Sequence, residues 1–323
     1  MTIDQELFKQ KAYDVFFPKY KSKLPFFEKN EVKLAHYTSA GTAYEIIKNE
    51  EIWLRNTNYM NDHDEVNHGL KCLHNILSST EVLNFFKDTL NSISPGIFNE
   101  TTQRFDRMAP YLNQETYISC FSEHDPVSEN DLGRLSMWRA YGGNSGVSII
   151  FNTGPFFSES NSTKALSFLV DYEKTSSLKG HLLQTLHRLQ EEREYFSSIP
   201  KERLIDTILM YLLSFPLAIK HPGFQEEKEL RIVYNPAVLV SDKLIADTVT
   251  LDDIPQKIYK IPLKDYPEEG FIGATPKDII NRIIIGPSHH ATSLKKTFIE
   301  LLQNKGVENA ETKVVCSDIP LRT

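Results

Sequence analysis

The chain has 323 residues, of which 40% are hydrophobic and 24% are charged, and its formal net charge is −7. This is the composition of an ordinary globular protein, and the acidic balance argues against a non-specific nucleic-acid binder. The three cysteines are widely spaced and form no CxxC pair or disulfide framework, which favours a reducing, cytoplasmic location.

Neither the N-terminal segment nor the most apolar stretch has the pattern of a membrane segment. The first residues carry acidic side chains and lack the apolar region of a signal peptide. Residues 207–219 are the most apolar stretch, but they are too short to span a bilayer and contain Pro216. We therefore expect no membrane partner.

The first half of the chain predicts both helices and strands. Residues 4–30 read as a helix and then a loop, with a break at Pro18. Residues 31–37 read as a strand, and Ser39 caps the helix after it because its hydroxyl accepts a bond from a first-turn N–H group. The polar residues 123–133 are expected in a surface loop. The other elements are a strand at 51–55, helices over 64–91 that Pro95 and Gly96 end, a strand at 117–122, a helix at 135–141, and strands at 146–152 and 165–172.

The second half opens with two long helices and then returns to strands. Residues 177–198 have leucines near helical spacing, and residues 201–219 form a second helix that Pro216 kinks or ends. Strands follow at 229–234, 256–262 and 278–286, then a helix at 293–305 and a strand at 312–316. Strands in separate blocks, without a regular βαβ rhythm, predict an α+β fold. We expect an N-terminal helical segment (1–30) and a single α+β domain (31–323) with a helical insertion at about 177–222.

Four clusters have residue types that suit a binding or catalytic site. In the last of them, Glu227, Glu229 and Arg231 share one face of a strand, because side chains alternate along it. The alternative for each cluster is structural: a solvated Glu–Arg ladder, a core histidine at His36, and core rings at Trp138 and Tyr141. The clusters are His36-Tyr37-Thr38, Cys120-Phe121-Ser122, Met137 to Gly142, and HPGFQEEKELRIVY at 221–234.

A metal site is the other chemistry that the residues suggest. His68 and Cys72 are four apart on an expected helix, and acidic and histidine side chains flank them. The spacing matches no established zinc pattern, and a solvated helix is the preferred interpretation, so we predict no metal. Walker, GxGxxG and GxSxG motifs are absent from the sequence. The residues concerned are Asp62, His63, Asp64, Glu65, His68, Cys72 and His74.

Five motifs in order resemble a bacterial family catalogued as "domain of unknown function 2971". The resemblance covers about residues 31–290 and gives no activity by itself. The motifs are HYT at 36–38, CFS at 120–122, MW with YG at 137–142 before the strand GVSIIF, F-x-x-E-x-E-x-R at 224–231, and IIIGP at 283–287.

The order of these elements is also similar to the ADP-ribosyltransferase fold of the diphtheria-toxin and poly-ADP-ribose-polymerase type. That resemblance implies a split mixed or antiparallel sheet with flanking helices, and NAD bound in its cleft. It implies that His36 orients a ribose with Tyr37 and Thr38 beside it, and that Glu229, or alternatively Glu227, is the catalytic carboxylate. Phe121 stands where the family has a tyrosine, with Ser122 next to it. Trp138 or Tyr141 would stack on nicotinamide, and Arg231 would position Glu229 or contact pyrophosphate.

The resulting hypothesis is an NAD-dependent ADP-ribosyltransferase or NAD glycohydrolase, used in bacterial defence or toxin systems, with a protein or nucleic acid as acceptor. One alternative is a non-catalytic module on the same fold that binds a nucleotide or a nucleic acid. The second alternative is a metal-dependent hydrolase built from the histidines near residues 63–74. Fold resemblance alone does not choose among these functions.

Overall fold

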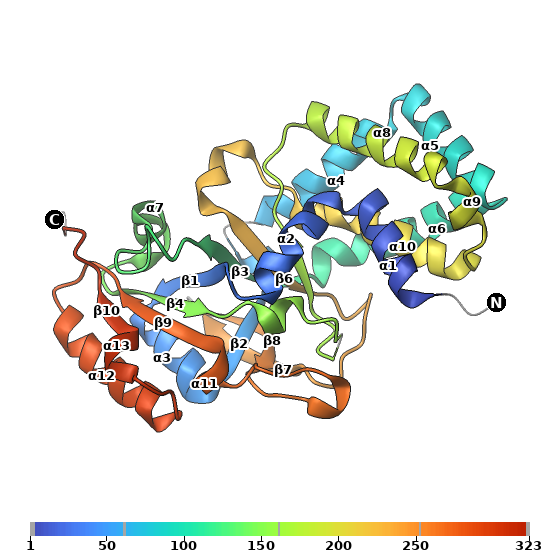
Figure 1. The fold of residues 1–323 in the computed structure, drawn as a ribbon. Helices are drawn as coiled ribbons and strands as arrows, with labels where there is room; N and C mark the ends of the chain where they lie inside the picture. The colour runs from blue at the N-terminus through green and yellow to red at the C-terminus, as the bar shows by residue number, and fades with distance from the viewer. Residues whose placement is uncertain (1–3, 61–62, 161, 252, 321–323) are drawn as a thin grey trace. The chain divides into compact units, whose positions relative to one another are not determined.

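The computed structural model describes residues 4–60, 63–160, 162–251 and 253–320, and of residues 63–65 it describes only the backbone. The chain folds into two compact units (Figure 1). The helical unit comprises Met1–Lys23, Thr57–Thr116 and Phe168–Phe224. The sheet unit comprises Leu24–Asn56, Tyr117–Ser167 and Gln225–Thr323.

Amphipathic helices build the helical unit around an apolar core. The predicted spacing in residues 177–198 is confirmed, since Leu178, Leu182, Leu186 and Leu189 are all buried. The predicted single helix is interrupted at Glu192, which separates α8 from α9. The helices are α1 (Gln5–Phe16), the first part of α2 (Pro18–Glu28), α4 (His63–Leu77), α5 (Thr80–Ile93), α6 (Ile97–Gln114), α8 (Thr175–Glu191), α9 (Arg193–Ser197) and α10 (Lys201–Ala218), with a 3-10 turn η1 at Thr57–Tyr59.

Proline and glycine set two details of this unit. The prediction of a loop after Pro18 is wrong, because Pro18 begins α2, where its missing N–H group costs nothing. Pro216 lies inside α10, near the end of that helix. A Cβ atom on Gly69 of α4 would lie 2.2 Å from the carbonyl oxygen of Phe215 in α10. Only glycine allows these two helices to approach so closely.

A sheet with short connecting elements builds the sheet unit. The strands are β1 (Lys33–Ser39), β2 (Glu51–Asn56), β3 (Tyr117–His124), β4 (Gly146–Phe151), β5 (Leu166–Leu169), β6 (Glu229–Tyr234), β7 (Ile245–Leu251), β8 (Ile254–Pro262), β9 (Ile280–Ile285) and β10 (Val314–Cys316). The helices and turns are α3 (Ala40–Asn49), α7 (Leu135–Met137), η2 (Trp138–Gly142), η3 (Gly154–Phe157), η4 (Pro222–Glu227), η5 (Pro267–Glu269), α11 (Pro276–Ile279), α12 (Ala291–Asn304) and α13 (Ala310–Lys313). β5 and η4 each continue across the boundary between the units. Ser39 caps α3 as predicted, since its hydroxyl accepts a bond from the Thr42 N–H group.

The sheet is open, mixed and largely antiparallel. Its strand order is β10-β9-β4-β1-β3-β2-β8-β7, and β6 pairs with β3 and β5. The pair β9–β10 is parallel, and α12 lies in the crossover between those two strands. The chain is therefore an α+β protein with flanking helices, as the sequence predicts. Strand β7 was not expected; its residues are mostly exposed and show no clear alternation of burial.

The sheet divides at β3. Along one edge of β3, β1 pairs with its C-terminal residues and β2 pairs with its N-terminal residues. Along the other edge β6 pairs with β3 from Tyr117 to Ser122. The two strands β1 and β2 thus share one edge of β3, and the β1–β3 ladder ends at Ala35.

Different elements cover the two faces of this sheet. Trp138 of η2 packs on one face with Ala35, Tyr37, Ile150 and Ile284. On the other face, Cys316 of β10 lies against the start of α12, its sulfur 3.7 Å from the carbonyl oxygen of Ala291. Figure 1 shows α7 on one side of β1, β4 and β9, with α3 and α12 on the other side.

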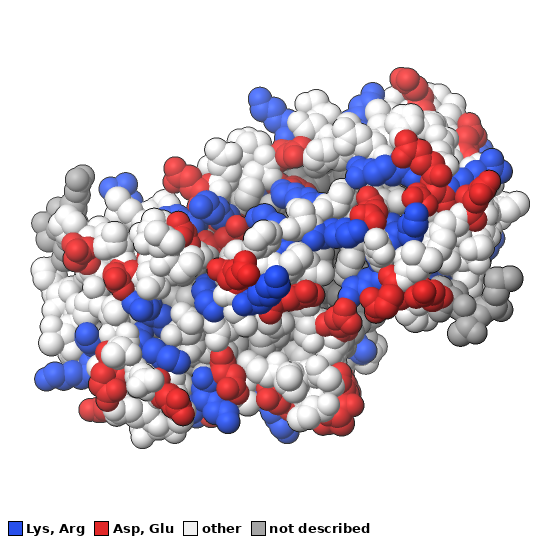
Figure 2. Space-filling view, in the orientation of Figure 1, with Lys and Arg blue, Asp and Glu red and all other residues white. Residues whose placement is uncertain are grey.

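The surface carries charges of both signs. In the view of Figure 2, basic and acidic side chains lie next to one another over most of the visible face. Among the residues that the structure describes, no helix combines the length and the apolar character needed to cross a membrane.

Candidate functional site

Three adjacent strands bring the main sequence motifs side by side. Ala35 of β1 pairs with Ser122 of β3, and Ser122 pairs with Glu229 of β6. Directly paired residues point to the same face of a sheet, so these three side chains share one face. We call it the carboxylate face, defined by Ser122 and Glu229.

His36 lies on the opposite face. It pairs with Ile149, and its ring centroid is 5.3 Å from that of Phe121. Side chains alternate along a strand, so His36 and Phe121 point away from the face that bears Ser122 and Glu229. We call this second face the aromatic face, since Phe121 also contacts Phe151 and Phe156 there.

The His36 ring holds β1 and β3 together where their ladder ends. Its Nδ1 atom is 2.9 Å from the carbonyl oxygen of Cys120. A carbonyl only accepts, so Nδ1 carries the proton and Nε2 of the neutral ring is an acceptor. Burial lowers the pKa of His36, and the bond to Cys120 opposes that shift. His36 is therefore a neutral structural link at the point where the sheet divides.

Glu229 and Arg231 form a buried ion pair on the carboxylate face. Arg231 Nε donates to Glu229 Oε1 over 2.8 Å, and Arg231 Nη2 lies 3.4 Å from Oε2. Glu229 is 5% exposed and Arg231 1% exposed. The alternative of a solvated charge ladder does not hold for β6, because every residue of this strand is buried. A carboxylate held by two donors in a low-dielectric setting is strongly oriented.

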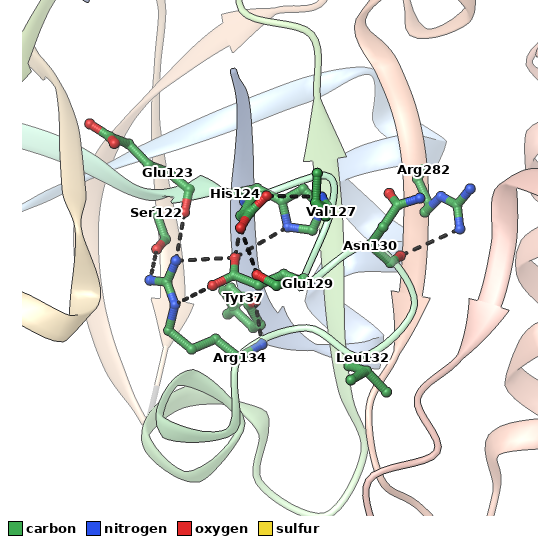
Figure 3. A network of polar contacts seen from close by, with 12 residues as sticks. Tyr37, Ser122, Glu123, His124, Val127, Glu129, Asn130, Leu132, Arg134 and Arg282 are labelled. Atoms are coloured by element: carbon green, nitrogen blue, oxygen red, sulfur yellow. Dashed lines mark hydrogen bonds and ion pairs between the residues drawn. The ribbon is translucent and has the colours of Figure 1, made fainter. Parts of the chain in front are cut away.

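Arg134 organises the polar network above this face (Figure 3). Its Nε and Nη2 atoms donate to the two carboxylate oxygens of Glu129 over 2.8 and 3.1 Å. Its Nη1 donates to the Ser122 hydroxyl over 2.6 Å, and its Nη2 donates to the Glu123 carbonyl over 2.7 Å. The guanidinium thereby joins the 123–133 loop to β3.

The same network includes two buried titratable groups. The Arg134 backbone N–H donates to the Tyr37 hydroxyl over 2.9 Å, and burial raises the pKa of Tyr37 to about 12. His124 Nδ1 lies 3.6 Å from Glu129 Oε2. Burial lowers the pKa of His124, and the charge of Glu129 opposes the shift.

Trp138 is a core residue enclosed by glycines. Its indole N–H donates to the Leu132 carbonyl over 2.9 Å, and its ring meets Tyr37 edge-on at 4.8 Å. A Cβ atom on Gly133 would lie 2.6 Å from this indole, and one on Gly286 would lie 2.9 Å from it. The glycine of the IIIGP motif therefore makes room for the tryptophan of the MW motif.

Tyr141 stands at the open side of the same segment. Residues Trp138–Gly142 form a π-helix turn instead of the predicted α-helix, so Trp138 and Tyr141 do not share a face. Tyr141 is 39% exposed, whereas Trp138 is 6% exposed. The Tyr141 hydroxyl donates to Glu227 Oε1 over 3.2 Å. The accessible ring of Tyr141 thus lies beside the carboxylate of Glu227, which comes just before β6 in the chain.

The structure divides the predicted site residues into two groups. Tyr37, Ser122, Glu229 and Arg231 point to the carboxylate face, and Trp138, Tyr141 and Glu227 lie over it. His36, Thr38 and Phe121 point to the aromatic face. His36 and Glu229 do not meet as predicted, because the register of β1, β3 and β6 places their side chains on opposite faces of the sheet.

Sequence reasoning missed Arg134, Glu129 and His124. The polar stretch 123–133 was expected in a surface loop, and Val127 is indeed 91% exposed. Glu129 and Arg134 nevertheless have side chains only 12% and 13% exposed. The sequence signal for this pair was a glutamate and an arginine five residues apart, with Gly133 between them.

The structure describes part of the cluster that suggested a metal site. Asp62 lies outside the described residues, as do the side chains of His63, Asp64 and Glu65. His68 Nε2 lies 3.6 Å from the sulfur of Cys72, which is buried. Among the side chains that the structure describes, no group of three or more histidine, cysteine or acidic residues is placed to hold a metal ion.

Comparison with known proteins gives one match. Residues 137–232 match a family model described as protein of unknown function (DUF2971). The match begins at the MW motif and ends within β6, so it contains Tyr141, Glu227, Glu229 and Arg231. This agrees with the family resemblance for that part of the chain. No curated protein and no solved structure matches the chain.

Proposed function

We propose that the protein cleaves the nicotinamide–ribose bond of NAD, as an ADP-ribosyltransferase or an NAD glycohydrolase. The observation that carries the proposal is the placement of Glu229. It lies directly across from Ser122 on the neighbouring strand, and Arg231 holds its carboxylate. The adjacent strands β1, β3 and β6 carry the three motifs that resemble the ADP-ribosyltransferase fold.

The chemistry needs a fixed negative charge close to the ribose. The bond from the anomeric carbon to the nicotinamide nitrogen breaks, and the electron pair leaves with nicotinamide. The ribose acquires oxocarbenium character, as in glycoside hydrolysis. An oriented carboxylate stabilises that charge more in the transition state than in the ground state. Glu229 is a carboxylate of this kind, because Arg231 holds it on the carboxylate face.

The open side of the site supplies the groups that meet the reactants. Glu227 is half-buried and lies within reach of solvent, so it is suited to accept the proton of the incoming nucleophile. That nucleophile is water in a glycohydrolase and an acceptor group in a transferase. Tyr141 is the exposed ring that stacks on cationic nicotinamide, since Trp138 is enclosed in the core. His36 stays outside this cluster.

The proposal is tested by measuring nicotinamide release from NAD by the purified chain and by Glu229→Gln. We expect release by the wild type and a loss of about 100-fold or more in kcat for the variant, because the stabilising charge is gone. Glu229→Gln also disturbs a buried ion pair, so its melting temperature must be measured. Glu227→Gln is the second variant, since its half-buried side chain is easier to replace.

The exposed Glu308→Gln is the matched control and should behave as the wild type. Absence of nicotinamide release by the wild type, together with absence of NAD-dependent labelling in a lysate, would rule out the proposal.

A non-catalytic module is the second candidate, and one observation favours it. Glu229 is 5% exposed and ion-paired, which is also what a purely structural carboxylate shows. Under this alternative NAD or RNA raises the melting temperature of the protein without being consumed.

A further inference from the structure

We propose that Arg134 is a positioning residue that fixes the backbone just ahead of Glu229; its catalytic consequence rests on the proposed function. Arg134 Nη1 donates to the carbonyl oxygen of Glu226 over 2.8 Å and to that of Glu227 over 3.1 Å. These carbonyls end the η4 turn, where a helical segment leaves its last acceptors without internal partners. Arg134 satisfies them from the neighbouring loop.

The backbone at this point needs such support. Lys228, between the two glutamates, has φ 44°, in the left-handed region that residues with a side chain seldom adopt. The Ser122 hydroxyl donates to the Glu227 carbonyl, and the Glu123 N–H donates to the Lys228 carbonyl over 2.8 Å. Donors from outside the turn therefore hold residues 226–228 in this shape.

Glu129 keeps the guanidinium of Arg134 in place. The two side chains meet through two parallel bonds, and both are largely removed from solvent. A planar fork makes this paired contact, and its Nη1 group shares its two hydrogen atoms among the two carbonyls and the Ser122 hydroxyl. A lysine at this position has a single ammonium group, which does not reach all of these acceptors together.

The position of the carboxylates follows from that backbone. Glu227 directly precedes the left-handed residue and accepts a hydrogen bond from Tyr141. Glu229 directly follows that residue and enters the sheet opposite Ser122. A rotation at Lys228 moves one carboxylate relative to the other. Small displacements of reacting groups have large effects on rate, so losing the Arg134 contacts should lower kcat more than it weakens NAD binding.

The test compares the full-length wild type with Arg134→Lys by amide hydrogen exchange and by steady-state kinetics. We expect exchange in residues 225–230 to be at least tenfold faster, with residues 146–151 of β4 unchanged. We also expect kcat for nicotinamide release to fall at least tenfold while KM for NAD stays within twofold. Arg282→Lys is the control, because Arg282 bonds Asp131 and the Asn130 carbonyl, away from residues 226–228.

Each outcome decides the point. Wild-type exchange rates at 225–230 in Arg134→Lys overturn the inference, as does an equal kcat loss in Arg282→Lys. If the wild type releases no nicotinamide, the proposed function fails, and the exchange comparison alone decides whether Arg134 holds this segment. If Arg134→Lys does not fold, Ser122→Ala removes another donor to the same carbonyl, and exchange at 225–230 about threefold faster is expected. Unchanged exchange there overturns the inference.

Discussion

His124 is buried beside an ion pair, and this gives the protein a pH-sensitive residue. Its imidazole lies next to the Glu129 carboxylate. The charges of Arg134 and Asp125 also act on the imidazole. Its pKa is lowered from the ordinary value of 6.5 because burial disfavours the charged ring. The unfolded chain therefore binds the proton more tightly than the folded chain does.

This residue predicts how stability depends on pH. The free energy of unfolding should fall as the pH drops below about 6.5, until the folded-state pKa of His124 is passed, with a slope of at most about 1.4 kcal/mol per pH unit from this group. His124→Asn should flatten that slope in urea unfolding between pH 7 and pH 5. Some slope should remain, because burial also lowers the pKa of His36.

The exposed His289→Asn serves as the control and should keep the wild-type slope. A wild-type slope in His124→Asn would contradict the role given to this ring.

Single residues also mark the limit of prediction from the sequence. The side chain of Arg134 bonds groups up to 93 residues away in the chain, such as the Glu227 carbonyl. No local pattern encodes that distance, so the arginine and its partner Glu129 read as ordinary loop charges. The HYT, CFS, MW and E-x-E-x-R motifs were recognisable because each is a compact run of unusual residue types.

The alternation of side chains along each strand was predictable from the sequence, whereas the register between neighbouring strands was not. The sequence correctly separates Glu229 and Arg231 from Leu230 and Ile232. Whether His36 shares a face with Glu229 depends on the register across β1, β3 and β6. A shift of one residue exchanges the two faces, and the register comes from long-range pairing. The alternative of a solvated Glu–Arg ladder does not hold for β6, whose residues are all buried, because the sequence of a strand does not encode what covers it.

The division of the sheet at β3 predicts a structural role for His36. His36→Leu leaves the Cys120 carbonyl without its ring donor, which should lower the free energy of unfolding by about 1–3 kcal/mol. The kcat for nicotinamide release should stay within twofold of the wild type, because His36 points to the aromatic face. Chemical unfolding and the release assay measure the two effects.

The exposed His290→Leu is the comparison for the loss of a surface imidazole. A large loss of kcat in His36→Leu with an unchanged KM would place His36 in the reaction and contradict the two-face arrangement.

At the scale of the molecule, the chain passes repeatedly between its two units. It leaves the sheet unit after Asn56 and again after Ser167, and it returns at Tyr117 and at Gln225. Helical periodicity in residues 175–218 was visible in the sequence. The grouping of those helices with residues 57–116 rests on contacts between distant segments, which periodicity does not report.

We propose that NAD binds over the carboxylate face, between Tyr141 and Glu229. The most direct test is amide hydrogen exchange of the wild-type protein with and without saturating NAD. We expect slower exchange at residues 138–142 and 225–234, with little change at 245–251 of the edge strand β7. Binding of NAD without protection at 138–142 and 225–234, or with protection confined to other segments, would contradict it.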